Sequence, residues 1–243
     1  MTLVLVGALG FVMGLAAHDL AIQGLTDNLK LRPLVGVCPT CHTNRGWHHL
    51  RCPECGRHIQ REPVVATVTA LVSVAFAHGL GIELILLPYL GFLLLTMALV
   101  VTDLEEFRIV DRLNLRGSLA LGAVLGAVAV SLGESGALWR GMLGAAAYFA
   151  GATILWLAVR GRGFGAGDVK LAPILGLFTA YISWGTLGWA LFAMAIIGGV
   201  IAIAMVAMGA ARMKTELPYG PPMIIGAWLA IVLAGIGTFP IPT

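Results

Sequence analysis

The sequence LILLPYLGFLLLTMALVVTD occupies residues 84–103 and is almost entirely apolar until its last residue, Asp103. An α-helix rises about 1.5 Å per residue, so a helix over residues 84–102 is long enough to cross the ~30 Å hydrocarbon core of a membrane. The stretch therefore predicts a transmembrane helix with a carboxylate at its border. Similar apolar runs predict further membrane helices near residues 3–22, 64–80, 117–133, 137–159, 169–187, 188–211 and 222–240.

The composition agrees with a membrane protein. The chain is 59% hydrophobic and 11% charged, whereas roughly 25% of the residues in a soluble domain are charged. This difference excludes a water-soluble globule. The net charge is only +3, and the basic residues do not alternate with aromatic ones, which excludes a nucleic-acid-binding surface. We expect an all-α integral membrane protein with about eight transmembrane helices in a lipid bilayer.

The basic residues are distributed unevenly between the two sets of connections. One set comprises residues 23–63, 103–116, 160–168 and 212–221, and the other consists of tight turns near residues 81, 135 and 187. Of the 15 Lys and Arg residues, all except Arg140 lie in the first set or, in the case of Lys170, just inside the next helix. Basic connections stay in the cytoplasm. This pattern predicts that the first set is cytoplasmic and that both termini are outside.

Glycines mark one turn and two helix surfaces. Gly79 and Gly81, with His78 and Glu83, interrupt the apolar sequence before residue 84 and predict a short connection between two helices. Small residues at short helical spacings let membrane helices approach closely. We therefore predict close helix packing at Gly7, Gly10, Gly14, Gly122 and Gly126.

All four cysteines lie in the first predicted cytoplasmic loop. Cys38-Pro-Thr-Cys41 and Cys52-Pro-Glu-Cys55 form two C-x-x-C pairs separated by ten residues. Each pair can form a tight turn, and four thiolates complete a tetrahedral site that suits zinc. Two disulfides are the alternative, although thiols stay reduced in the cytoplasm. Four sulfurs already close a structural site, so we do not expect ligands among His42, His48, His49 and His58.

The loop divides the predicted chain into three parts. Residues 1–22 form a first transmembrane helix, residues 23–63 form a cytoplasmic zinc-binding loop, and residues 64–243 form a seven-helix membrane domain. The loop is too short and polar to bury a core, so we expect metal binding to supply its folding free energy.

Two carboxylates lie at the predicted cytoplasmic border of the bilayer. Asp103 ends its span, and Asp168 begins another within Gly163-Phe-Gly165-Ala-Gly167-Asp168. Ionisable groups at this depth are costly unless they are hydrated, paired or functional. Two adjacent carboxylates could share one proton, which is the starting state of an aspartic protease. Gly165 and Gly167 would leave room for an extended peptide. The alternative is that an Asp at a helix N-terminus, as Asp168 is, only caps the helix.

A family resemblance favours the protease hypothesis. The segment Gly165-Ala-Gly167-Asp168-Val-Lys170-Leu171 resembles the G-x-G-D-x-K-L motif of the type IV prepilin peptidases, which are GxGD intramembrane aspartic proteases. Asp111 follows Asp103 by eight positions, as an acidic residue does in the family. The paired C-x-x-C motifs are similar, and Pro218-Tyr219-Gly220-Pro221 resembles the family's P-F-G-P element.

The resemblance implies an endopeptidase of the bacterial inner membrane. Its expected substrates are type IV prepilin or pseudopilin precursors, from which it would remove a short basic leader at the cytoplasmic face. Asp103 and Asp168 would be catalytic, and Gly165, Gly167, Pro218 and Gly220 would contact the substrate. The family also implies possible N-methylation of the new N-terminus with S-adenosylmethionine. Glu105, Glu106 and Asp111 could attract the leader's basic residues, although ordinary solvated side chains are the alternative.

Two other functions fit parts of the sequence. A proton- or cation-coupled transporter could use Asp103 and Asp168 as carriers, but we find no internal repeat and both residues lie at the membrane edge. An assembly scaffold could dock partners on the zinc loop, but it would leave the Gly-Ala-Gly-Asp segment unexplained. For Pro218–Pro221 we expect a position near Asp168, with a plain helix-initiating turn as the alternative.

Overall fold

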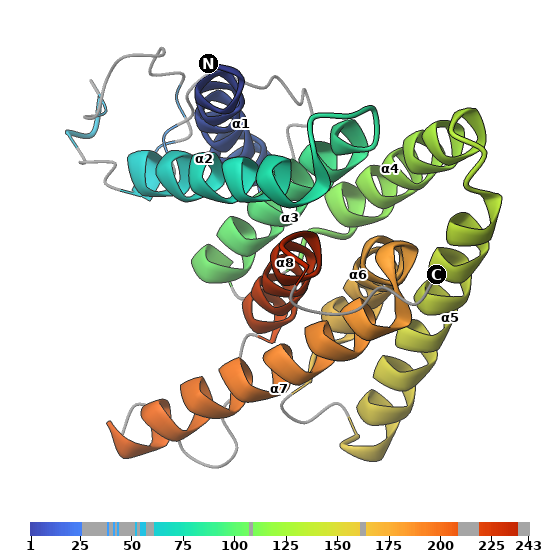
Figure 1. Ribbon diagram of the computed structural model, residues 1–243. Coiled ribbons are helices and arrows are strands. Elements are labelled where there is room, and N and C mark those ends of the chain that lie inside the picture. The colour runs from blue at the N-terminus through green and yellow to red at the C-terminus, as the bar shows by residue number, and fades with distance from the viewer. Residues whose placement is uncertain are drawn as a thin grey trace.

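The computed structural model describes residues 1–25, 38, 41, 43, 52, 54–56, 61–106, 109–160, 164–208 and 219–237. Within these ranges the chain forms eight helices and no strands (Figure 1). The all-α prediction is therefore confirmed. The helices are α1 (Thr2–Leu25), α2 (Arg61–Leu80), α3 (Leu86–Glu106), α4 (Asp111–Ser131), α5 (Ser135–Ala158), α6 (Ala166–Ile182), α7 (Trp184–Ala207) and α8 (Gly220–Gly235).

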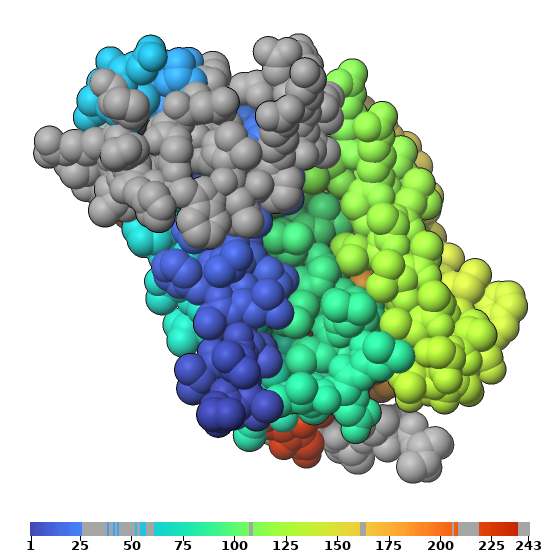
Figure 2. All heavy atoms as spheres, turned by 90° about the horizontal axis from the view of Figure 1, so that it is seen from above, coloured from blue at the N-terminus to red at the C-terminus, as the bar shows by residue number. Residues whose placement is uncertain are grey.

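Six of these helices are long and apolar enough to cross a membrane: α1 to α5 and α7. The remaining two, α6 and α8, have 17 and 16 residues and pack in the interior. Helix α8 contacts α2, α3, α6 and α7. From above, α3 (green) lies between α1 (blue) and α4 (light green) (Figure 2). The bundle therefore surrounds α3, α6 and α8, and two of these helices carry Asp103 and Asp168.

The expected turns are present, with one boundary displaced. Gly81 has a φ of +78° between α2 and α3, and Gly133 has a φ of +75° between α4 and α5. The connection predicted near residue 187 is instead at Ser183, which has extended backbone and accepts a hydrogen bond from the Thr186 N–H at 3.0 Å. This capping bond ends one helix and starts the next. The sequence is apolar on both sides of Ser183, so this helix boundary could not be recognised from hydrophobicity.

The predicted glycine packing is confirmed on α1. A Cβ built on Gly14 would lie 2.5 Å from the Ala66 Cα, and one on Gly10 would lie 2.8 Å from the Ser73 Cβ. Both positions press α1 against the backbone of α2. The absence of a side chain is therefore what sets the distance between these two helices.

The same prediction is wrong for α4 within this chain. A Cβ on Gly126 would meet nothing within 4 Å, and one on Gly122 would meet only a Leu177 methyl group at 3.6 Å. These two glycines therefore lie on a surface of α4 that the described parts of the chain leave open.

Arg140, the one basic residue outside the connections predicted to be cytoplasmic, has a structural role. Its guanidinium donates hydrogen bonds to the backbone carbonyls of Ala180 at 2.8 Å, Tyr181 at 2.5 Å and Ile182 at 3.0 Å. These carbonyls belong to the last turn of α6, where the helix itself offers no N–H partners. A cation at this end also interacts favourably with the helix dipole. Arg140 on α5 therefore caps α6.

Candidate active site and metal centre

Asp103 lies in the last turn of α3 and is buried, with 5% of its surface exposed. Its Oδ2 atom is inaccessible to solvent and has no hydrogen-bond partner among the residues that the structure describes. A buried, unbonded carboxyl oxygen is costly, so its presence needs an explanation, of which a functional role is one. The sequence predicts that Asp103 lies at the membrane border. The structure adds that its side chain is buried between helices of the bundle.

Asp168 lies in the first turn of α6 and is equally buried. Gly165 precedes the helix with extended backbone, at φ −80° and ψ 151°. This backbone lets the Gly165 N–H donate a hydrogen bond of 2.9 Å to Asp168 Oδ2. One carboxylate oxygen therefore does cap the helix, as the alternative interpretation proposed. The bond also fixes the direction of the carboxyl group.

Ile109 and Gly220 connect the two aspartates. The Cβ of Ile109 lies 3.2 Å from where a Cβ on Gly167 would be, and its Cδ1 lies 3.5 Å from the corresponding position on Gly220. Gly220 in turn packs against the Asp103 carboxyl group. Segments from α3, α6, α8 and the α3–α4 connection thus form one cluster.

Gly220 is the tightest point of this cluster. A Cβ on Gly220 would lie 2.9 Å from Asp103 Oδ2 and 3.3 Å from its Cγ. At these distances a methyl group fits only if the Asp103 carboxyl group or the start of α8 shifts. The glycine therefore lets the start of α8 approach the carboxyl group of Asp103.

The neighbouring Phe164 and Tyr219 were missed by sequence reasoning. Their ring centroids are 5.6 Å apart, and each ring precedes a glycine of the cluster, Gly165 or Gly220. The contact therefore ties together two segments that carry site residues. An aromatic residue directly before each glycine motif was the available signal.

The proline-containing element is only partly described. Pro218 lies outside the described residues, whereas Tyr219, Gly220 and Pro221 are within them. Helix α8 begins at Gly220, two residues earlier than predicted, with Pro221 and Pro222 in its first turn. Proline is tolerated there because the first N–H groups of a helix have no partner within it. The segment starts a helix, and Gly220 also lies against Asp103.

Two ion pairs flank the aspartates. Arg61 at the start of α2 donates to Glu105 at 2.5 Å, and Lys170 on α6 donates to Asp111 at 2.6 Å. Glu105 and Lys170 lie two residues beyond Asp103 and Asp168. Of the three loop acids expected to be open to a basic leader, Glu105 and Asp111 thus have internal partners. Both pairs are at least partly exposed and contribute little stability.

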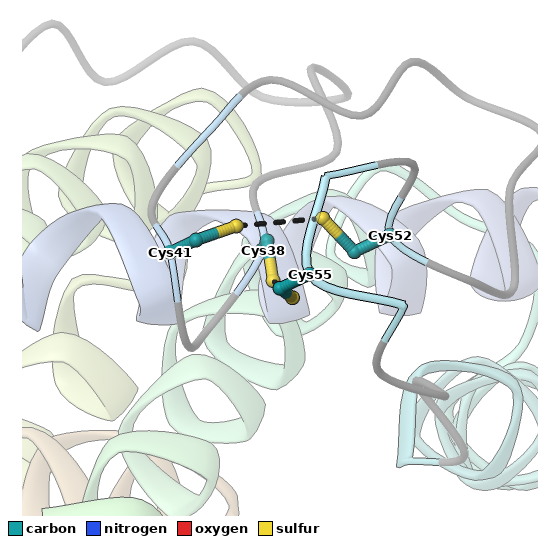
Figure 3. Close-up of side chains that lie close together, drawn as sticks. All are labelled: Cys38, Cys41, Cys52 and Cys55. Carbon is teal, nitrogen blue, oxygen red and sulfur yellow. Dashed lines mark hydrogen bonds between the residues drawn. The ribbon is translucent and has the colours of Figure 1, made fainter.

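The four cysteines converge on one point (Figure 3). The Sγ atoms of Cys41 and Cys52 are 3.4 Å apart, those of Cys38 and Cys55 are 3.6 Å apart, and all four lie within 4.8 Å of one another. In a tetrahedral site with Zn–S bonds of about 2.3 Å, sulfur atoms are separated by ~3.8 Å. The cluster therefore has dimensions that accommodate one such ion.

Backbone and hydroxyl groups surround the sulfurs. The Cys38 N–H donates to the Thr43 carbonyl at 3.1 Å, closing the first turn, and Gly56 N–H donates to the Cys52 carbonyl at 2.9 Å, closing the second. Gly56 has a φ of +68°, which favours glycine. Hydrogen bonding from the Cys55 backbone is the main cause that lowers the pKa of Cys52 to about 6. The predicted non-ligands His42, His48, His49 and His58 lie outside the described residues.

Comparisons with known proteins identify the family. The model of the type IV leader peptidase family matches residues 89–210, which include Asp103 and Asp168. No solved structure matches this chain. Three similar curated proteins are all named prepilin leader peptidase/N-methyltransferase. They come from Pseudomonas putida (29% identical, covering 80% of this chain and 70% of the relative), Aeromonas hydrophila (30%, 76% and 63%) and Bacillus subtilis (29%, 74% and 69%).

The family match covers half of the chain, and the alignments with these relatives extend beyond it. Together with the helical bundle and the buried aspartate cluster, they place the protein: the chain belongs to the type IV leader peptidase family.

Proposed function

We propose that this protein is an intramembrane aspartic endopeptidase that removes the leader of prepilin or pseudopilin precursors, with Asp103 and Asp168 as its catalytic pair. The observation that carries the proposal is the buried cluster in which Asp168 contacts Gly165, Asp103 contacts Gly220, and Ile109 joins the two segments through Gly167 and Gly220. The names of the relatives supply the substrate class.

The chemistry follows from two carboxyl groups that hold one proton between them. The ionised carboxylate takes a proton from water, and the water oxygen attacks the carbonyl carbon of the scissile peptide bond. The protonated carboxyl group donates its proton to the carbonyl oxygen. The first carboxyl group, which took its proton from water, then gives that proton to the amide nitrogen. The C–N bond breaks, the amine leaves, and the second carboxylate takes back a hydroxyl proton of the intermediate as the new carboxyl product forms. The Gly165–Asp168 hydrogen bond holds one carboxyl group in a fixed direction during these transfers.

Glycines give the substrate access to this pair. An extended peptide must bring its carbonyl group within hydrogen-bond distance of both carboxyl groups. Gly165 and Gly167 on one side, and Pro218 and Gly220 on the other, are the residues that we assign to substrate contact. Their missing or short side chains let a peptide backbone approach closely.

We further propose that Cys38, Cys41, Cys52 and Cys55 bind one structural zinc ion. Four thiolates fill a tetrahedral site and leave no position for a catalytic water. The ion would hold the loop of residues 23–63 in a fold that its small apolar content cannot maintain. This assignment makes residues 64–243 the peptidase domain and residues 1–22 a separate first membrane helix.

The proposed orientation follows the distribution of basic residues. The zinc loop and catalytic pair face the cytoplasm of a bacterium, in its inner membrane, and both termini lie outside.

The names of the relatives also contain N-methyltransferase. We therefore include methylation of the new N-terminus, with S-adenosylmethionine as the donor, in the proposal. The competing transporter hypothesis has no support from the comparisons, since all the relatives named above are peptidases.

The test uses purified protein in detergent with a type IV prepilin and S-adenosylmethionine. Mass spectrometry should detect a shortened pilin and, if methylation occurs, the additional mass of a methyl group. The matched control is Asp168→Asn, which keeps the shape of the side chain but cannot transfer the proton. Absence of cleavage by the wild-type protein, together with substrate-driven proton flux in liposomes, would support the transporter instead.

A further inference from the structure

A long apolar groove lies between α4, α5 and α6. Its volume is about 680 Å³, and its walls include Leu119 of α4, Met142 of α5 and Leu177 of α6. Figure 1 shows α4 and α5 diverging from the turn that connects them. Leu119 is largely exposed at the rim, so the groove is open along its side. All polar lining residues are near its proposed cytoplasmic end: Asp111, Asn114, Ser118 and Lys170.

The groove is lined by Gly122 and Gly126, the α4 glycines against which no described helix packs its backbone. Gly122 and Gly126 are separated by four residues on α4, the same spacing as Gly10 and Gly14 on α1. On α1 a neighbouring helix fills that surface, whereas a Cβ on Gly126 would meet nothing within 4 Å. A surface of this kind lets the backbone of a second helix approach closely.

A buried polar side chain provides an independent sign of a ligand. Asn114 lines the groove and is only 2% exposed. Its Oδ1 accepts a hydrogen bond from the Ser118 hydroxyl at 3.2 Å. Its –NH₂ group has no acceptor within the part of the chain that the structure describes, although buried amide groups are normally bonded. A peptide carbonyl in the groove would satisfy it.

The polar end of the groove is continuous with the catalytic cluster. Asp111 lies two residues after Ile109, which contacts Gly167 and Gly220. Lys170 lies two residues after Asp168, and the Lys170–Asp111 ion pair spans the mouth. A peptide that leaves the groove at this end therefore arrives beside Asp168.

We propose that this groove binds the membrane-embedded helix of the substrate, the segment that directly follows the scissile bond. This inference rests on the proposed peptidase function. The groove extends along α4 from Asp111 to Gly126, which is ~22 Å at the rise of an α-helix. That length exceeds half of the ~30 Å hydrocarbon core, so an occupant that fills it passes the middle of the bilayer. A transmembrane helix meets this requirement, whereas a lipid chain stays within one leaflet.

Polar groups at the mouth agree with the same orientation. A helix that enters from this end presents its N-terminus, where the first N–H groups have no partners. The Asp111 carboxylate, paired with Lys170, lies there as a hydrogen-bond acceptor. The extended residues between the scissile bond and the helix retain free carbonyl groups, and Asn114 is placed to donate to one of them.

The first test fills the groove without disturbing the interior. Gly126→Leu places a side chain in open space, and Gly122→Leu places one beside Leu177 in the groove wall. The matched control is Gly151→Leu, on an exposed open part of α5. Each variant is assayed with a full type IV prepilin and with a soluble peptide that spans the cleavage site but lacks the hydrophobic segment. We expect at least a tenfold loss of kcat/KM for the prepilin with the groove variants, no loss with the control, and unchanged cleavage of the peptide.

The outcomes separate the two proposals. Wild-type protein that cleaves neither substrate refutes the peptidase function itself. If the groove variants cleave the prepilin at the wild-type rate, the groove does not bind the substrate helix and the proposal is refuted. If they lose activity equally on prepilin and peptide, the substitutions have damaged the active site, and the proposal is refuted as well. Thermal unfolding of each variant identifies any loss of folding.

A second measurement identifies the occupant directly. A photoreactive amino acid is placed at Leu119 in the groove, or at the exposed Ile203 of α7 as a control, in an Asp168→Asn background that retains uncut prepilin. We expect cross-links from position 119 to the hydrophobic segment of the prepilin, and none from position 203. Cross-links from position 119 only to lipid, or only to a second copy of this chain, would overturn the proposal.

Discussion

Replacing Gly220 with alanine tests whether the cluster around Asp103 is the catalytic centre. The new methyl carbon would lie 2.9 Å from Asp103 Oδ2, whereas a relaxed C···O contact is about 3.3 Å or more. The Asp103 carboxyl group or the start of α8 must therefore move by ~0.4 Å. Ile109, whose Cδ1 is 3.5 Å from the same methyl position, restricts movement of the methyl group on its other side.

The expected magnitude follows from the displacement. A misplacement of about 1 Å in an active site can cost ~100-fold in rate. If the logarithm of the rate falls in proportion to distance, ~0.4 Å costs roughly fivefold to tenfold. The loss should appear in kcat for prepilin cleavage, with little change in KM, because the carboxyl group acts in the chemical step.

The matched control is Gly199→Ala on α7, where the new methyl group meets nothing within 4 Å. Both variants are assayed for cleavage rate and thermal unfolding. A Gly220→Ala protein with the rate of Gly199→Ala and unchanged stability would refute the assignment of Asp103 to the catalytic pair. A fall in the unfolding temperature that accounts for the lost activity would show that Gly220 is needed only for packing.

Three further predictions concern other parts of the molecule. Asp103→Asn and Asp168→Asn should each abolish prepilin cleavage while the protein stays folded. Cleavage should fall much less in three control variants: Glu105→Gln, Glu106→Gln and Asp111→Asn. The catalytic assignment fails if Asp103→Asn retains substantial activity. Elemental analysis of reduced protein should find about one zinc ion per chain. The zinc should be lost in the Cys38→Ser variant, and also on acidification, because protons compete with the metal for the thiolates. Disulfides found by mass mapping would contradict this prediction. Arg140→Ala should lower stability by about 2 kcal/mol because it removes charged hydrogen bonds to the end of α6; an unchanged unfolding temperature would contradict the capping role.

The helices could be predicted because the membrane imposes a length on them. Apolar runs long enough to cross the bilayer can be recognised without knowledge of their neighbours. The same reasoning placed Asp103 and Asp168 at helix ends, because a carboxylate interrupts an apolar run visibly. It could not place the α6–α7 boundary at Ser183, where both flanking sequences are apolar and a single hydroxyl cap separates the helices.

The contacts around the aspartates could be predicted only in part. The motif glycines were recognised from their resemblance to a family, but no local pattern showed that Ile109 would lie between Gly167 and Gly220. This contact joins residues that are far apart in the sequence, and the packing of four segments creates it. Likewise, the lone cation Arg140 could be recognised as an exception to the charge distribution, but its purpose depends on the carbonyls of a different helix.

The two glycine pairs show that the same sequence pattern can have different tertiary surroundings. Gly10 and Gly14 have the same spacing as Gly122 and Gly126, and small residues at this spacing favour a close approach by another helix. The α1 pair is covered by α2, whereas the α4 pair faces the groove between α4, α5 and α6. The pattern predicts that a helix can bind but not which helix binds. The aspartates of this protease are buried inside the bundle. The groove at Gly122 and Gly126 of α4 therefore gives a membrane-embedded substrate a route from the side of the bundle.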